Sequence, residues 1–305
     1  MIKKSVFLGS KKFGFELFKA LFVANKYVQW KVICPPDLHD SRSYLEKFED
    51  FTAKNGIELH IMSSPESVSE LTKHYLPDVM IVCGYYRILP SSMFKFVSKG
   101  VWGIHNSLLP EYRGGSPLVW QIINEERLLG SSFFRFADGM DDGPVLAQVN
   151  ISNEHKLTIS DASDRIENEW LKRIPNLWSD FCNDRLYPQE QDHSKATYCA
   201  QRQEYDGVID WRNHAGTIDA FIRAQSHPYP RAFFQKENQI VRVISHEVDS
   251  RKIYGTQGQV FEVKDDYVTV CCGDCSAIRL IELQVDGKVM KAKNVLNSIK
   301  IRLML

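Results

Sequence analysis

Hydrophobic and polar positions alternate along the first eighty residues in the order expected of strands joined by helices. Residues 5–8 form an apolar run that stops at Gly9, and residues 13–24 carry apolar side chains at helical spacing. The same order then repeats, with strands predicted over 28–34, 58–62 and 78–83 and helices over 43–54 and 67–75. Strands that alternate with short helices predict an α/β fold with a doubly wound, mostly parallel sheet.

A polar stretch at residues 188–195 has the composition of a linker, and the pattern changes beyond it. Short apolar runs broken by Gly, Asp and Asn predict strands over 239–246, 259–263, 267–272 and 277–283. Such spacing is typical of a small open β-barrel. The sequence therefore predicts a larger domain over residues 1–190 and a smaller β domain, with its linker, over residues 191–305.

The overall charge argues against a chain that binds polyanions through a basic surface. The 305 residues include 38 Lys and Arg and 38 Asp and Glu, which gives a formal net charge of 0. No apolar run approaches the ~18 residues of a membrane span, and Lys11 and Lys12 interrupt the first apolar stretch before it resembles a signal peptide, so we expect a cytoplasmic protein.

The cysteines favour free thiols over disulfides or a metal site. Seven cysteines are an odd number, and they are scattered through a chain of ordinary size. Cys272 and Cys275 have the spacing of a zinc knuckle, but no second pair of matching spacing accompanies them. A tight turn between two strands is the preferred interpretation, and no metal is expected.

Residues 84–148 are dense in Gly, Pro, Tyr and polar residues, which is typical of shaped loops over a scaffold. His105 ends a short predicted strand, where an imidazole can carry a proton or donate to an oxyanion, or simply cap the strand. The segment from Arg113 to Pro117 suits phosphate or carboxylate recognition, although it also fits a sharp turn. Asp141 and Asp142 can orient a histidine, bind a cation or form a solvated turn.

Together these loops resemble the folate-dependent formyltransferases, which include methionyl-tRNA and amino-sugar formyltransferases. The resemblance is carried by His105-x-Ser-Leu-Leu-Pro-x-x-Arg-Gly, by Asp141-x-Gly-Pro and by Gly84-Tyr-x-x-Ile-Leu-Pro. Farther on, Ala196-Thr-Tyr and the run from Asp206 to Trp211 are similar to the segment that leads into an oligonucleotide-binding-type barrel in longer members. The resemblance implies a formyltransferase-like variant of the Rossmann fold followed by that barrel.

The resemblance also implies a reaction, in which a primary amine attacks the formyl carbon of 10-formyltetrahydrofolate. In this chain His105 would stabilise the oxyanion and help to shuttle a proton, and Asp141 would orient the imidazole. Loop backbone would hold the pterin ring of the formyl donor. The residues that the resemblance assigns to that ring are Tyr86, Arg87, Ile88, Leu89, Asp138, Gly139, Met140 and Asp142.

One position departs from the family pattern. Gly103 stands where the family usually has an asparagine, and the loss of one oxyanion donor typically costs about a hundredfold or more in rate. Asn106 is expected to substitute only if the backbone turns directly after His105. Otherwise a backbone amide or water serves, the enzyme is slow, or the protein only binds folate or a nucleotide; a working enzyme is favoured. A hydrolase triad with Ser107 and Asp141 is disfavoured, because Ser107 is too near His105 in sequence.

The charge distribution favours a small acceptor over tRNA. Residues 200–305 hold 15 Lys and Arg against 13 Asp and Glu, a difference of +2, which is a weak footprint for nucleic acid. The turn Gly9-Ser10-Lys11 also differs from the Gly-Thr-Pro usual in the tRNA enzymes. We expect a nucleotide-linked amino sugar of surface polysaccharide synthesis, with methionyl-tRNA as the alternative and an amino acid or hydroxylamine as a minor option.

Several residues are candidates to meet the diphosphate of such a sugar. They are Ser10, Lys11, Arg113, Gly114, Gly115 and Ser116. A free edge of the small barrel would also offer a surface for a homodimer.

Overall fold

The computed structural model describes residues 2–37, 40, 42–154 and 156–303, and the chain divides into two compact units. The first unit comprises Met1–Gly114, Gly130–Ile151 and Asp164–Tyr198, and the second comprises Gly115–Leu129, Ser152–Ser163 and Cys199–Leu305. The last change of unit therefore falls eight residues beyond the boundary placed at residue 190. Two earlier segments also belong to the second unit, which the sequence did not indicate.

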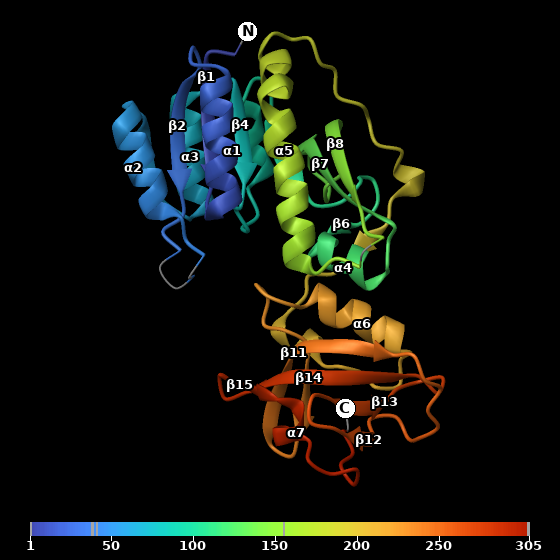
Figure 1. The fold of residues 1–305 in the computed structure, drawn as a ribbon. Coiled ribbons are helices and arrows are strands. Elements are labelled where there is room, and N and C mark those ends of the chain that lie inside the picture. Colours follow the sequence, from blue (N-terminus) through green and yellow to red (C-terminus); the bar gives the residue numbers. More distant parts are fainter. Residues whose placement is uncertain (1, 38–39, 41, 155, 304–305) are drawn as a thin grey trace. The chain divides into compact units, whose positions relative to one another are not determined.

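A seven-stranded sheet organises the first unit (Figure 1). Its strand order is β3-β2-β1-β4-β5-β7-β8. The bounds are β1 Lys4–Gly9, β2 Gln29–Cys34, β3 Glu58–Ile61, β4 Val79–Cys83, β5 Val101–His105, β7 Leu128–Arg135 and β8 Val145–Ser152. Strands β1 to β5 pair in parallel and β7 pairs antiparallel with β5. The predicted mostly parallel sheet is confirmed.

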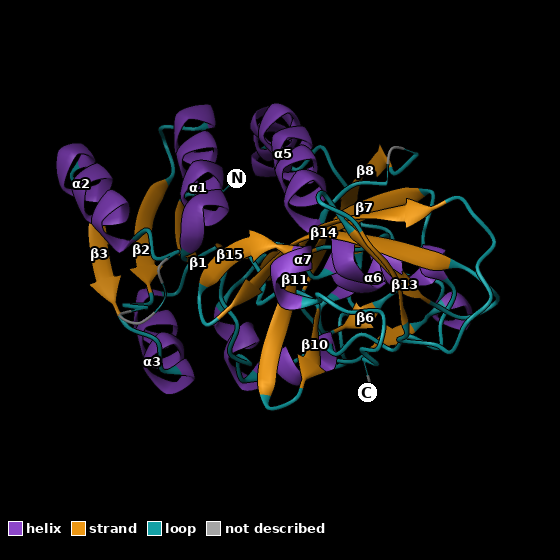
Figure 2. Cartoon of the chain, turned by 60° about the horizontal axis from the view of Figure 1, so that its bottom comes forward, coloured by secondary structure: helices purple, strands orange, loops and turns teal. Residues whose placement is uncertain are grey.

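Helices cover both faces of this sheet. They are α1 Lys11–Ala24, α2 Leu45–Asn55, α3 Pro65–Tyr75 and α5 Ile159–Cys182, joined by the short helix η1 Ser91–Phe96. Figure 2 shows α1, α2 and α5 on one face and α3 on the other. Neighbouring side chains of a strand point to opposite faces, so Phe7 packs against Phe18 and Phe48 while Val6 and Leu8 join the cluster on the α3 side.

The carboxyl ends of β1 and β4 meet at one edge of the sheet. A Cβ atom at Gly9 would lie 2.1 Å from the carbonyl oxygen of Cys83, so only glycine permits this approach. The amide of Ser10 donates to that same carbonyl over 3.3 Å. The turn after β1 is thus packed against the end of β4, at the edge where parallel sheets bind ligands.

A six-stranded antiparallel sheet forms the core of the second unit. Its strands are β10 Phe233–Lys236, β11 Gln239–Asp249, β12 Val260–Val263, β13 Val268–Cys271, β14 Ala277–Val285 and β15 Lys288–Lys291, with helices α4 Pro117–Ile123, α6 Ala215–Ala224 and α7 Ala292–Val295. The order is β10-β11-β14-β13-β12, and β15 pairs with β14. Ile218 and Ile222 of α6 pack on this sheet. The arrangement is a half-barrel that is consistent with the predicted open barrel.

The suspected cysteine pair lies beside this sheet. Burial raises the pKa of Cys272 to about 12, which makes its thiol a poor metal ligand. Among the described residues there is no group of three His, Cys, Asp or Glu side chains placed to hold a metal. No helix within the described ranges combines the length and hydrophobicity that a membrane crossing requires.

Glu167 of α5 lies in a groove against α1, beside Asp164, Lys12 and Glu16. Burial, reinforced by the charge of Asp164, raises the pKa of Glu167 to about 7. An unfolded glutamate titrates near pH 4.3, so between these values the unfolded state holds fewer protons than the folded state. Folding stability should therefore fall as the pH rises from about 4.3 to about 7 and level off above that.

The variant Glu167→Gln is expected to lose this part of the pH dependence. It should match the parent protein near pH 4 and exceed it at pH 8 by about 1–3 kcal/mol, a value reduced for the partial exposure of the side chain. Urea unfolding at both pH values measures the difference. Parallel stability curves for the two proteins would contradict the prediction.

Candidate active site

His105 is the last residue of β5 and lies at the carboxyl edge of the sheet. Its side chain is buried, and its Nε2 lies 2.8 Å from the carbonyl oxygen of Tyr112. A carbonyl only accepts, so Nε2 carries a proton and the other ring nitrogen takes part in any exchange. That atom, Nδ1, is 3.5 Å from Oδ2 of Asp141. The two residues that the sequence paired are therefore brought together.

Asp141 is held in place by backbone and side-chain contacts. Its Oδ2 accepts a hydrogen bond of 2.8 Å from the amide of Gly114. Gln191 donates from Nε2 to the carbonyl oxygens of Asp141 and Gly143, over 2.8 and 2.6 Å. The other end of the same amide, Oε1, accepts from Nε and Nη2 of Arg113 over 3.1 and 2.7 Å. We call Arg113, Gln191 and the Asp141 turn the clamp.

Gln191 is a positioning residue that the sequence analysis missed. It belongs to the polar stretch 188–195, whose composition is that of a linker, yet its side chain is only 7% exposed. No local sequence signal distinguishes it from its neighbours, because its partners are 50 and 78 residues away along the chain. A buried amide that uses both of its ends fixes the turn more firmly than the surrounding loop would alone.

Replacing Gln191 with glutamate should disturb this turn selectively. The carboxylate keeps the acceptor that Arg113 uses, but it removes the amide donor and places negative charge against two carbonyl oxygens. We expect turnover to fall about tenfold to a hundredfold, since catalytic geometry is sensitive to displacements near 1 Å. Steady-state assays with a thermal melt test this. The neighbouring exposed residue Glu190 gives the control Glu190→Gln, which should leave both readouts unchanged.

Gly103 precedes His105 by two residues and faces the ring of Phe136. A Cβ atom at Gly103 would lie 2.5 Å from Cε1 and 2.7 Å from Cζ of that ring, closer than real atoms approach. Phe136 also packs on Phe134, with ring centres 5.2 Å apart, and Phe134 lies edge-on to His105 at 6.2 Å. An aromatic ring therefore fills the volume that a longer side chain at position 103 would need.

The backbone turns directly after His105, as a contribution from Asn106 requires. The amide of Ser107 donates to the carbonyl oxygen of His105 over 2.9 Å. Asn106 is exposed. The hydroxyl oxygen of Ser131 lies 3.1 Å from Oδ1 of Asn106 and 3.1 Å from the carbonyl oxygen of His105. Ser107 is buried and donates to the carbonyl of Glu111 over 2.6 Å, so it is not presented as a hydrolase nucleophile.

The two loops assigned to the pterin ring expose apolar side chains. Ile88 is 91% exposed and Met140 is 61% exposed, although both follow strands of a well-packed sheet. In the second loop a Cβ atom at Gly139 would lie 2.0 Å from Oδ2 of Asp142, so the turn is tight. Oδ1 of Asp142 is buried and has no hydrogen-bond partner among the residues that the structure describes. Leu89 is buried in the core and anchors the first loop.

Comparison with known proteins matches both parts of the chain. Residues 3–176 match the family described as Formyl transferase, and residues 202–300 match its C-terminal domain. The chain belongs to the formyl transferase family. It is 28% identical over 289 residues to methionyl-tRNA formyltransferase of Caldanaerobacter subterraneus subsp. tengcongensis, which covers 92% of each chain. It is 31% identical to the methionyl-tRNA formyltransferase of Sorangium cellulosum over 220 residues, 69% of this chain and 68% of that one.

Solved structures share the fold of this formyl transferase. An N-formyltransferase from Helicobacter canadensis, in complex with folinic acid and dTDP-3-aminofucose, gives a TM-score of 0.70 at 19% identity over 92% of this chain and 99% of that one. HypX from Aquifex aeolicus, in complex with tetrahydrofolic acid, gives 0.65 at 17% identity over 97% of this chain. This formyl transferase spans about half of the length of HypX, since 47% of that chain is covered.

Two residues expected to meet a diphosphate are already engaged at the end of β1. Ser10 is fully buried and donates to the carbonyl of Gly84 over 3.0 Å. Nζ of Lys11 pairs with Asp37 at 2.7 Å and with Asp40 at 2.6 Å. Arg42 also pairs with Asp40 at 3.0 Å, so two cations and two carboxylates engage one another here.

The same end carries a tyrosine of the first loop. Tyr86 donates its hydroxyl to Asp37, and that hydrogen bond raises the pKa of Tyr86 to about 12. Lys11 lies over the ring, 5.5 Å from its centre. Tyr86 is therefore tied to the β1 turn through Lys11 and Asp37, which links the first loop to the strand edge.

Polar groups of the segment from Arg113 to Ser116 are also engaged within the protein. Arg113 is 2% exposed and serves the clamp, with Nη2 also 3.1 Å from Nδ1 of His193. The amide of Gly114 donates to Asp141, that of Gly115 donates to Cys199 over 3.0 Å, and Ser116 accepts from a neighbouring amide. In the structure these two amides therefore point inward, toward Asp141 and Cys199.

Proposed function

We propose that the protein transfers a formyl group from 10-formyltetrahydrofolate to the primary amine of a small acceptor. The observation that carries the proposal is the approach of His105 and Asp141 at the carboxyl edge of the sheet, 3.5 Å apart. This edge adjoins two loops whose exposed side chains fit a flat ligand. Family membership makes formyl transfer the chemistry, and the donor is proposed from the fit of those loops.

The residues at the two loops suit a folate. Ile88 and Met140 are exposed apolar side chains that a heterocycle would cover. The buried Oδ1 of Asp142, without a partner in the described part of the chain, would accept from a ring N–H. Tyr86, Arg87 and the backbone of 138–140 would complete this surface. When bound, the folate would supply the formyl carbon that the amine attacks.

The chain's own residues would hold and move the proton. The Tyr112 carbonyl keeps one N–H of His105 occupied, so the Nδ1 edge is the one presented to Asp141. Asp141 would orient the ring and hold a proton released near it, while the burial of His105 limits exchange with water. Asn106, beside the turn after His105, is the remaining candidate for a side-chain donor to the oxyanion.

For the acceptor we propose a nucleotide-linked amino sugar. Nine of the fifteen Lys and Arg residues between positions 200 and 305 lie in ion pairs with carboxylates of the same region. Paired cations contribute little to a phosphate-binding surface, so the C-terminal region is poorly suited to tRNA. Methionyl-tRNA is the second candidate, favoured by curated relatives at 28% identity that carry this name.

One assay separates these acceptors. The purified protein is supplied with 10-formyltetrahydrofolate and, in parallel, with dTDP- and UDP-linked amino sugars or with charged initiator tRNA. We expect turnover with at least one sugar and none with tRNA. Turnover with tRNA alone would make methionyl-tRNA the acceptor and leave 10-formyltetrahydrofolate as the formyl donor. Folate binding without turnover on any acceptor would instead identify a binding protein, for which Gly103 is the motivating residue.

A further inference from the structure

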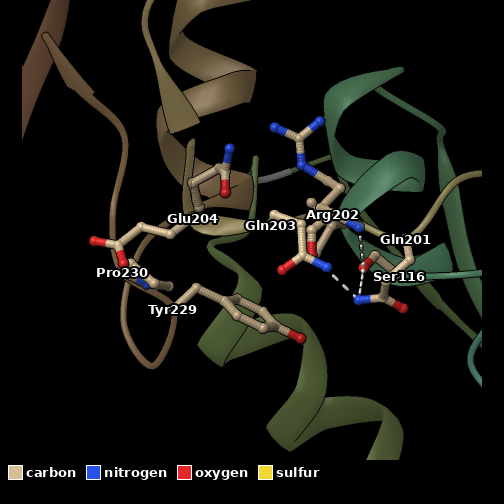
Figure 3. Close-up of a pocket in the computed structure, with 9 residues that line it drawn as sticks. Ser116, Gln201, Arg202, Gln203, Glu204, Tyr229 and Pro230 are labelled. Atoms are coloured by element: carbon tan, nitrogen blue, oxygen red, sulfur yellow. Dashed lines mark hydrogen bonds between the residues drawn. The ribbon is translucent and has the colours of Figure 1, made fainter. Parts of the chain in front are cut away.

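A pocket is lined only by residues of the second unit (Figure 3). Its volume is about 360 Å³, which is enough for one or two small rings. It is bounded by Ser116 at the start of α4, by residues 201–204 and by the loop that contains Tyr229 and Pro230. Neither its residues nor its chemistry are used by the proposed formyl transfer.

Backbone approach shapes one wall of this pocket. A Cβ atom at Gly115 would lie 2.4 Å from the Cα of Gln201, so glycine lets the two segments touch. Ser116 then accepts from the amide of Arg202 over 3.3 Å and from Nε2 of Gln201 over 3.1 Å. These contacts hold Ser116 and the 201–204 segment together, so the wall is formed before any ligand arrives.

Arg202 is fixed in this wall, and its Nε–H group has no partner among the described residues. Its guanidinium lies over the rings of Trp120 and Phe221, at 4.9 and 5.4 Å from their centres. Nη2 donates to the carbonyl of Asp206 over 2.5 Å, whereas Nε is buried and has no hydrogen-bond partner among the described residues. A buried donor without a partner is costly, and an acceptor on a ligand would relieve that cost.

The charges of the pocket balance. Arg202 and Glu204 are the charged residues of the lining; Glu204 pairs with Arg242, and the carboxylate of Asp206 acts on Arg202, so two cations face two carboxylates. A phosphate would meet these carboxylates as well as the guanidinium, so the pocket favours a neutral ligand. The remaining polar groups of the lining are amides and hydroxyls, and each such side chain can donate and accept. They belong to Gln201, Gln203, Gln225, Ser116 and Tyr229.

An aromatic surface completes the pocket. Tyr229 is 41% exposed, and Figure 3 shows its ring lying between Pro230 and Gln201. A ring face offers apolar contact, and the groups around it offer hydrogen bonds in both directions. Sugar hydroxyls donate and accept in the same way, and a pyranose ring has a face of C–H groups that can lie on an aromatic ring.

We propose that this pocket binds a neutral, polyhydroxylated ring, that is, a sugar. One hydroxyl oxygen would accept from Nε of Arg202, further hydroxyls would pair with the amides and Ser116, and Tyr229 would cover the apolar face. The site goes beyond the proposed formyl transfer, because it needs neither folate nor His105.

Saturation-transfer NMR on the full chain tests the site. The probes are methyl α-D-glucopyranoside, N-acetyl-D-glucosamine and L-fucose, with thymidine and inorganic phosphate as probes of other chemistry. For an open pocket we expect at least one sugar to bind with a Kd of roughly 1–10 mM. Tyr229→Ala should weaken that binding about tenfold or more. Tyr205→Ala is the matched control, because Tyr205 is 72% exposed and does not line the pocket.

Arg202→Lys provides a second variant, since it keeps the charge and removes the Nε donor; it should also weaken sugar binding. If Tyr229→Ala fails to fold by circular dichroism, Gln201→Ala replaces it with the same expected result. His105→Ala should bind sugars as the parent does, so loss of turnover is read separately from loss of this site. Absence of binding by all three sugars, binding by thymidine or phosphate alone, or unchanged binding by folded pocket variants would overturn the proposal.

Discussion

Turnover of the variant His105→Ala should fall about a thousandfold, while binding of the folate persists. The imidazole lies at the strand end with Nδ1 3.5 Å from Asp141, and it is the group proposed to exchange the proton. General acid–base groups typically contribute 10²–10⁴-fold to a rate. Single-turnover kinetics with the accepted amine measures the chemical step, and fluorescence titration with 5-formyltetrahydrofolate measures binding.

The control for this variant is His74→Ala. His74 is exposed in the last turn of α3, so its loss removes an imidazole without touching the sheet edge. We expect parental rates and melting temperature from this control. A His105→Ala protein that folds, binds folate and retains more than about a tenth of the parental rate would remove His105 from the mechanism.

The second large effect concerns Gly103 and Phe136. Gly103→Asn alone should destabilise the protein by about 1–3 kcal/mol, because its Cβ would lie 2.5 Å from the Phe136 ring. Gly103→Asn combined with Phe136→Ala makes room for the amide beside His105. We expect kcat of the double variant to exceed that of Phe136→Ala about tenfold or more, since one added oxyanion donor is worth on this order.

Phe136→Ala alone is the control for the lost ring, and thermal melts of all four proteins form a double-variant cycle. The two changes should be coupled, with the asparagine tolerated better when the ring is absent. If Gly103→Asn alone has the melting temperature of the parent protein, the Phe136 ring does not restrict position 103. If the double variant folds but its kcat does not exceed that of Phe136→Ala, an asparagine at position 103 does not assist the reaction.

The sequence was sufficient to predict where the strands end and which loops carry the family motifs. The strands that end at Gly9, Cys83 and His105 are short apolar runs followed by Gly or polar residues, and local pattern is sufficient to find them. The pairing of His105 with Asp141 followed from the family resemblance, and the structure places Nδ1 of His105 3.5 Å from Oδ2 of Asp141. Their catalytic roles stay predictions until the variants are measured.

The partners of Lys11 and Arg113 could not be predicted, because charge in a sequence does not reveal what it pairs with. Lys11 looked available, but Asp37 and Asp40, which follow the next strand, neutralise it. Arg113 suited phosphate or carboxylate recognition, but it is buried and donates to Gln191, which lies 78 residues away along the chain. Side chains with long-range partners are set by tertiary packing, which residue spacing does not encode.

The clamp has a consequence for the order in which the protein is made. Gln191 leaves the ribosome 50 residues after Asp141, so a nascent chain can contain every proposed catalytic residue before the amide that holds their turn exists. A product terminated at residue 186 would carry His105 and Asp141 but leave Arg113 without its glutamine. A chain that ends before Gln191 would therefore lose activity, although the residues around Gln191 have the composition of a linker.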